Sequence, residues 1–225
     1  MNQPTSTLLT SLLPPQARSA EAFEDTPGVL LHPEEEAVIA KAVDKRRREF
    51  TTVRHCARQA LSALGRPAGP LVPGLRGAPV WPRGVVGSLT HCEGYRACAV
   101  ALGAEVVSLG IDAEPHAPLP EGVLDAIARP REQRQVARLA SHFPARAWDR
   151  LLFSAKESVY KTWFPLTGQP LDFQEAELDL DPERRTFHAR LLSRGHDHEG
   201  RLLETFEGRW RIERGLIVTA IAHQP

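Results

Sequence analysis

The feature that most constrains the fold is a short apolar run that ends in two acids. Val106 to Ile111 is apolar with a β-branched bias, which predicts a buried strand. Asp112 and Glu114 follow two residues apart, so an extended backbone directs both carboxylates to one side. Pro115 favours extended geometry at Glu114 and predicts the end of the strand. Two acids at the end of a buried strand need a cation or a proton, although a solvated strand end with two unrelated acids fits the same pattern.

The strongest predicted helix runs from Ala147 to Phe164 and ends before Pro165. Its apolar side chains recur at helical spacing and form one broad stripe: Trp148, Leu151, Leu152, Ala155 and Val159. Glu157 and Lys161 lie four apart on the opposite face. A surface ion pair fits this spacing and contributes only ~0.3–0.5 kcal/mol. The aromatic residues that flank the pair indicate instead that this face is covered too: Phe153, Tyr160 and Phe164. With Lys156, the face has the composition expected for the wall of a site.

The charge balance excludes one class of function. Lys+Arg and Asp+Glu number 28 each among 225 residues, whereas a dedicated nucleic-acid binder is usually basic. An anionic ligand must therefore meet a local basic patch.

Three cysteines fit a reducing compartment. Since no basic leader precedes the Leu8–Leu13 run and no apolar run could cross a bilayer, we expect a soluble, cytoplasmic protein without a membrane partner.

The remaining pattern predicts helices followed by strands. Residues 1–20 are rich in Ser, Thr, Gln and Pro and predict a loose N-terminus. Pro33 with three glutamates predicts a helix start, a second helix follows over Phe50 to Leu64, and Val123 to Leu139 predicts a helix with a basic side. Strands are expected at Val85–His91, Tyr95–Leu102, Ala176–Leu180, Thr186–Leu192, Gly208–Glu213 and Leu216–Ala222.

Three sets of residues could converge on one site. The acids are Asp112, Glu114 and Glu157, the cations are Arg46, Arg54, Lys156 and Lys161, and the polar pair is Ser88 and His91. Carboxylates without clustered Cys or His favour Mg²⁺ or Mn²⁺ shared with substrate phosphates. A Ser–His–acid hydrolase is excluded because no nucleophile elbow is present, and the missing Gly-rich loop disfavours an ATP or GTP enzyme. At the end of its strand, His91 fits a structural role nearly as well as a ligand contact.

Three segments in this order resemble the 4′-phosphopantetheinyl transferases of the surfactin- and enterobactin-synthetase type. They are Trp81 to His91 (WPRGVVGSLTH), Leu109 to Glu114 (LGIDAE) and Phe153 to Lys161 (FSAKESVYK). The upstream run RRREFTTVRHCAR is similar to the actinobacterial branch, and together the matches span most of residues 46–164.

The resemblance implies an α/β (α+β) fold, a pseudo-dimer of two similar lobes with the active site in the cleft between them. We expect an N-terminal lobe over residues 21–107 and a C-terminal lobe over residues 108–225. The implied activity transfers the 4′-phosphopantetheine arm of coenzyme A to a serine of apo acyl or peptidyl carrier proteins and releases adenosine 3′,5′-bisphosphate. Two alternatives remain open: a Mg²⁺-dependent phosphohydrolase of coenzyme A or a nucleotide, and a non-enzymatic coenzyme A-binding adaptor.

The resemblance also implies a role for each residue. Asp112, Glu114 and Glu157 would hold Mg²⁺, with Mn²⁺ as a substitute, and Glu157 and Lys161 would be catalytic. Coenzyme A would contact Arg46, Arg54, Arg76, Ser88, His91, Asp112, Lys156 and Lys161. The acidic carrier is expected to dock near Val123–Arg138, although a solvated amphipathic helix fits that segment too. Two lobes in one chain predict a monomer.

Overall fold

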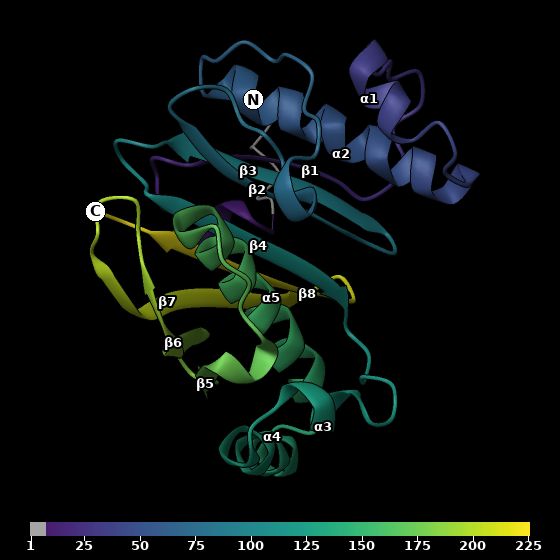
Figure 1. Ribbon diagram of the computed structural model, residues 1–225. Coiled ribbons are helices and arrows are strands. Elements are labelled where there is room, and N and C mark those ends of the chain that lie inside the picture. The colour runs from purple at the N-terminus through teal and green to yellow at the C-terminus, as the bar shows by residue number, and fades with distance from the viewer. Residues whose placement is uncertain (1–7) are drawn as a thin grey trace.

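The computed structural model describes residues 8–225, which form a mixed α/β structure with two antiparallel sheets (Figure 1). The first sheet has the order β1-β3-β2, with β1 (Arg18–Ala22), β2 (Val85–Cys92) and β3 (Tyr95–Leu102). The second has the order β4-β8-β7-β6-β5, with β4 (Ser108–Pro115), β5 (Ala176–Asp181), β6 (Thr186–His196), β7 (Leu202–Glu213) and β8 (Leu216–His223). The α/β class expected from the sequence is confirmed.

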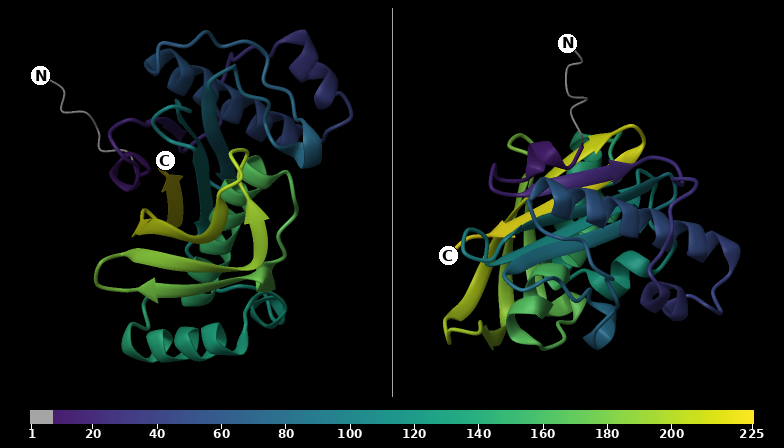
Figure 2. Two further views of the ribbon diagram at one scale, coloured as in Figure 1. Left: turned by 60° about the vertical axis from the view of Figure 1, so that its left-hand side comes forward. Right: turned by 90° about the horizontal axis from the view of Figure 1, so that it is seen from above.

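Each sheet carries one long helix of 20 residues. Helix α2 (Asp44–Ala63) packs on the three-stranded sheet and α5 (Trp148–Thr167) on the five-stranded sheet (Figures 1 and 2). The other helices are short or peripheral: α1 (Pro33–Val38), α3 (Val123–Ile127), α4 (Pro130–His142) and the 3₁₀ turns Thr10–Leu12, Leu75–Gly77 and Phe173–Glu175. The halves therefore share a helix-on-sheet plan but differ in strand number.

The apolar stripe predicted on α5 is buried. Trp148, Leu151, Leu152, Ala155 and Val159 are each at most 1% exposed and pack into a core with β6 and β7. Burying a leucine-sized side chain stabilises the fold by ~1.5–3 kcal/mol, so this stripe fixes which face of α5 remains for the site.

The end of α5 differs from the prediction. Pro165 lies inside the helix, which continues to Thr167. Proline lacks a backbone N–H, so Pro165 removes one hydrogen bond from the last turn of α5, and the helix continues through it. Gly168 ends the helix instead, with a left-handed φ of 66° and its N–H on the Phe164 carbonyl at 2.8 Å.

The two sheets meet where side-chain hydroxyls of β2 reach the backbone of β4. Ser88 Oγ accepts from Ile111 N at 3.1 Å, and Thr90 Oγ1 accepts from Ala113 N at 3.0 Å. Because these residues alternate along β2, both hydroxyls face the same side. They fix β4, and with it Asp112, against the first sheet.

Gly110 lets α5 approach β4 closely. A Cβ at this position would lie 2.1 Å from the Ser158 carbonyl oxygen and 2.2 Å from Thr162 Oγ1. Only glycine permits such contact between a strand and a helix. Glu157 and Lys161 therefore lie on a helix that is held against the strand carrying Asp112 and Glu114.

The N-terminal segment is ordered where the structure describes it. Residues 1–7 lie outside the described residues, but Leu8, Leu9 and Leu12 are at most 8% exposed and share a core with Tyr95. The loose end expected for residues 1–20 is therefore wrong for residues 8–20, because an isolated short leucine run gives no sign of the distant surface that covers it.

The helix predicted over Val123 to Leu139 is divided into α3 and α4. Arg129 takes an extended conformation, with φ −72° and ψ 158°, because Pro130 follows it. Pro130 then starts α4.

None of the helices in residues 8–225 is both long and apolar enough to cross a membrane.

Candidate active site

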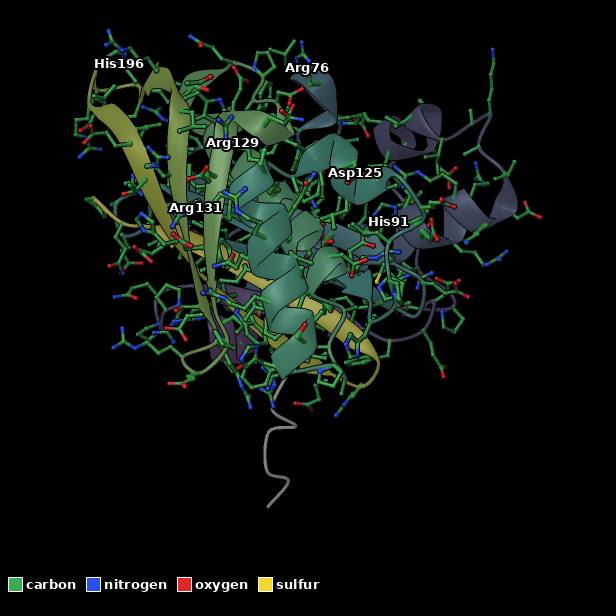
Figure 3. All side chains as sticks on the ribbon, turned by 90° about the horizontal axis from the view of Figure 1, so that it is seen from below. Arg76, His91, Asp125, Arg129, Arg131 and His196 are labelled. Atoms are coloured by element: carbon green, nitrogen blue, oxygen red, sulfur yellow. The ribbon has the colours of Figure 1, made fainter. Side chains whose placement is uncertain are left out.

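One cleft of about 640 Å³ collects side chains from both halves of the chain. It is lined by α2, the loop around Arg76, β2 and α5. Figure 3 shows Arg76 and His91 on the side of the molecule that carries the N-terminal helices. The cleft brings together most of the residues predicted from the sequence: Arg46, Arg54, Arg76, Ser88, His91, Glu157 and Lys161.

Asp112 joins this set through Lys161. Lys161 Nζ donates to Asp112 Oδ1 at 2.7 Å, and Thr90 Oγ1 donates to the same oxygen at 3.4 Å. The carboxylate is 5% exposed, and its Oδ2 atom has no hydrogen-bond partner within residues 8–225. A buried carboxylate oxygen without a partner is costly, so Asp112 is prepared to receive a cationic ligand.

Glu114 is held by an arginine that the sequence analysis did not select. Arg150 Nη1 donates to Glu114 Oε2 at 2.8 Å, while its other nitrogens donate to the carbonyls of Ala117 and Pro118. Arg150 thus fixes the acid and the loop that follows it. Burial, with the negative charge of Asp112, raises the pKa of Glu114 above its ordinary value, and Arg150 opposes the shift.

Glu157 faces the same cluster from α5. Burial raises its pKa, Lys161 opposes the rise, and the charges of Asp112 and Glu114 add to it. The three acids therefore interact electrostatically. A raised pKa favours the protonated form of a carboxyl, as expected for a group that accepts a proton or a cation during function.

A complete metal site is not preformed. Among residues 8–225, no three His, Cys, Asp or Glu side chains gather closely enough to hold an ion by themselves. Mg²⁺ in phosphate chemistry commonly uses one or two carboxylates, several waters and the substrate's phosphates. The unpartnered Asp112 oxygen and the half-buried Glu114 and Glu157 fit that mode of binding.

The other end of the cleft is basic. Arg46 Nη1 donates to His91 Nε2 at 2.6 Å, so that nitrogen acts as an acceptor. Burial lowers the pKa of His91, and Arg46 lowers it further. A neutral His91 therefore helps to orient Arg46. Arg76 is exposed on its 3₁₀ turn with a positive φ of 52°.

Two sequence-selected residues have other contacts. Ser88 is 4% exposed, and its hydroxyl accepts the Ile111 N–H. Lys156 does not line the large cleft: its ammonium is buried against Glu132 at 2.9 Å and donates to the carbonyls of Phe173 and Ala176. These partners occupy the donors of its ammonium, while its side chain lines a smaller cavity beside Glu157, so the predicted contact of Lys156 with coenzyme A stays a prediction.

Thr90 and Arg150 are the residues near the acids that sequence reasoning missed. Thr90 immediately precedes His91 and shares its motif, so its position was a usable signal. Arg150 lies 36 positions from Glu114, and nothing local in the sequence connects the two.

Comparison with known proteins defines the class to which this fold and site belong. A model described as the 4′-phosphopantetheinyl transferase N-terminal domain matches residues 34–101, and one described as the 4′-phosphopantetheinyl transferase superfamily matches residues 108–219. The chain belongs to the 4′-phosphopantetheinyl transferases, enzymes that transfer the phosphopantetheine arm of coenzyme A to carrier proteins. The family expected from the three sequence motifs is confirmed.

Three relatives in actinobacteria are similar over nearly the whole chain. The 4′-phosphopantetheinyl transferase Svp of Streptomyces mobaraensis is 58% identical over 96% of this chain and 89% of its own length. Npt of Nocardia iowensis is 50% identical over 96% of this chain and 100% of its own, and PptT of Mycobacterium tuberculosis is 48% identical over 96% and 97%.

Proposed function

We propose that transfer depends on Mg²⁺ held by Asp112, Glu114 and Glu157 together with the pyrophosphate of coenzyme A. The bound ion would neutralise charge on the diphosphate and polarise its β-phosphate, and Mn²⁺ could replace it. The unpartnered Oδ2 of Asp112 supports this assignment. Lys161, which donates to the other oxygen of Asp112, would share in neutralising the phosphate charge.

The basic end of the cleft binds the nucleotide in this proposal. Arg46, Arg54, Arg76 and His91 line the same cavity as Glu157 and Lys161, and this convergence is the observation that carries the proposal. Guanidinium groups are suited to phosphate oxygens because they present several donors in a plane. The 3′-phosphate would lie toward Arg46 and Arg54, and the pyrophosphate toward Lys161.

Glu157 acts as the general base, directly or through water. It takes the proton from the serine hydroxyl of the carrier, the serine oxygen bonds to the β-phosphorus, and the bond from that phosphorus to the leaving adenosine 3′,5′-bisphosphate breaks. Lys161 neutralises charge on the leaving group. The raised pKa of Glu157 favours its role as a proton acceptor.

A smaller cavity of about 220 Å³ is suited to the pantetheine arm. It shares Glu157 and Tyr160 with the large cleft and continues to Leu171 and Phe173. Phe153 packs on Phe173 with ring centroids 5.7 Å apart. An aromatic, partly apolar wall beside the proposed base fits an uncharged, flexible chain.

The carrier protein docks on α3 and α4, over Val123–Arg138. Three arginines lie within α4 and a fourth, Arg129, directly precedes it, and carrier proteins are acidic. Figure 3 shows Arg129 and Arg131 beside the strands of the five-stranded sheet.

We further propose a cytoplasmic monomer, since one chain supplies the whole cleft and all three cysteines are free thiols.

The decisive experiment incubates apo fatty-acid, polyketide and peptidyl carrier proteins with coenzyme A and Mg²⁺ and measures their mass. Transfer adds one phosphopantetheine to the carrier serine, whereas a phosphohydrolase cleaves coenzyme A and leaves the carrier mass unchanged. Glu157→Gln should remove most turnover and preserve the fold. Near-normal turnover by this variant would refute the role given to Glu157.

A further inference from the structure

Glu35 is a buried acid that the proposed mechanism does not use. It is 0% exposed, although it lies in a run of three glutamates whose other two members, Glu34 and Glu36, are exposed. It does not line the cleft. A carboxylate that is fully removed from water requires several polar partners, and those partners indicate what Glu35 does.

The Glu35 carboxylate connects three segments around the basic end of the cleft. It accepts hydrogen bonds from His32 N at 3.0 Å and Leu71 N at 2.9 Å, and from Arg58 Nη2. Helix α1, helix α2 and the loop that leads to Arg76 therefore meet at one side chain. Val38, Arg54 and Pro73 of these same segments line the cleft.

Arg54 is the cleft residue that depends most directly on this arrangement. Arg54 Nε donates to the Leu71 carbonyl at 2.8 Å, and the Leu71 N–H donates to Glu35. The backbone of Leu71 therefore links Glu35 to Arg54. Arg54 also lies with its guanidinium carbon 4.0 Å above the Phe50 ring. In the part of the chain described here, no hydrogen bond uses the two terminal amino groups of Arg54, which leaves them for a ligand.

The charge of Glu35 also matters to Arg54. Arg54 is 6% exposed, and burial lowers its pKa to about 10, while Glu35, whose Oε1 lies 4.0 Å from Arg54 Nε, is the largest influence opposing that fall. Loss of the carboxylate would leave a buried guanidinium beside two other cations, Arg46 and Arg58, without the acid that compensates them.

We propose that Glu35 is a positioning residue for recognition of the phosphate on the ribose of coenzyme A, and that it acts through Arg54. It fixes the backbone of Leu71, whose carbonyl holds Arg54 Nε, supplies the compensating negative charge, and so presents the terminal amino groups of Arg54 to the 3′-phosphate. This inference rests on the proposed placement of the nucleotide in the basic end of the cleft.

The test compares coenzyme A with 3′-dephospho-coenzyme A as substrates for the wild type and Glu35→Gln. Glutamine keeps the size of the side chain but loses its charge. We expect KM for coenzyme A to rise about tenfold, the range for hydrogen bonds that involve charged groups. KM for the dephospho substrate and kcat for both should change less than about twofold, because only one phosphate contact is altered.

Matched variants separate positioning from general loss of structure. Glu34→Gln, on the same helix but exposed, should keep the wild-type ratio of the two KM values, and Glu35→Asp should restore part of the ratio. Glu35→Gln combined with Arg54→Gln should discriminate no worse than Arg54→Gln alone, since residues acting through one contact are not additive.

An equal rise of both KM values in Glu35→Gln, or additive effects in the double variant, would overturn the inference. If Glu35→Gln does not fold, as judged by its melting curve, Glu35→Asp decides: an equal rise of both KM values in that variant would also overturn it. Wild-type protein that binds coenzyme A no better than its dephospho form would overturn the nucleotide placement itself, a separate failure that is detected without any Glu35 variant.

Discussion

Lys161 donates a hydrogen bond to Oδ1 of Asp112 at 2.7 Å, and Oδ2 of the same buried carboxylate has no partner in the part of the chain that the structure describes. The two oxygens of one acid are therefore distinct. One is oriented by a fixed cation on α5, and the other, on a residue within β4, is left available to a ligand.

Asp112→Asn should lower kcat by ~10²–10³-fold, the effect seen when one preorganised electrostatic contact is lost from an active site. Asparagine keeps the shape of the side chain but removes the negative charge that pairs with Lys161 and attracts a divalent ion. Binding of Mn²⁺ in the presence of coenzyme A, followed by electron paramagnetic resonance, should weaken in parallel. Wild-type turnover and Mn²⁺ affinity in this variant would contradict the role of Asp112.

The pKa values of Glu114 and Glu157, both raised by burial, predict how metal-free stability depends on pH. As pH rises from the ordinary carboxyl range through the raised pKa values, the folded state holds protons that the unfolded chain has lost, so the free energy of unfolding falls. Mg²⁺ should compensate for that loss, and its stabilisation should be larger at pH 7.5 than at pH 5.

Melting temperatures measured across this range, with and without Mg²⁺, test the effect. The difference between wild type and Glu157→Gln isolates one carboxyl, because His91 and His223, whose pKa values are lowered by burial, titrate in both proteins. A difference between the two proteins that does not vary with pH would contradict the prediction.

Gly110→Ala should destabilise the protein by ~1–3 kcal/mol, the usual cost of overpacking a core. The added Cβ would meet the Ser158 carbonyl oxygen and Thr162 of α5, backbone and buried side chain that cannot simply rotate away. Since α5 carries Glu157 and Lys161, we also expect lower kcat at temperatures where the variant is fully folded. Urea denaturation and steady-state kinetics measure the two effects, and Gly103→Ala, where the nearest atom lies 3.6 Å from the added Cβ, is the control.

The main features of the fold were predictable from the sequence because they depend on local pattern. The stripe on α5 has helical periodicity, and the apolar run before Asp112 has the composition of a buried strand. Both follow from the arrangement of neighbouring residues. The break between α3 and α4 was also encoded locally, in Pro130, but the arginines around it gave a helical pattern that obscured the boundary.

The site was predictable in its chemistry but only in part in its contacts. Lys156 and Lys161 lie five residues apart on one helix, yet Lys161 faces Asp112 while Lys156 faces Glu132 from α4. Which partner each lysine meets depends on how distant elements pack, and periodicity along α5 does not contain that information. The same reason hides Arg150 and separates Glu35 from the exposed glutamates beside it.

The proposed docking surface requires a choice of arginines that only the structure supplies. Reversal of Arg131 and Arg134 to glutamate is the test that the sequence suggests. Arg131, however, is paired with Glu177 at 2.9 Å and Asp179 at 2.6 Å, so its reversal would also disturb the contact of α4 with β5. Arg134 and Arg138 are exposed and lie four residues apart on one face of α4.

Arg134→Glu with Arg138→Glu should therefore raise KM for the carrier protein about tenfold at low salt and leave KM for coenzyme A unchanged. Charges at the rim of an interface act mainly on encounter with an oppositely charged partner, and the effect should shrink as salt screens them. Arg66→Glu, an exposed reversal beyond the end of α2, is the matched control. If the carrier KM of the double variant equals that of the wild type and of the control, the acidic partner docks elsewhere and α4 is an ordinary solvated helix.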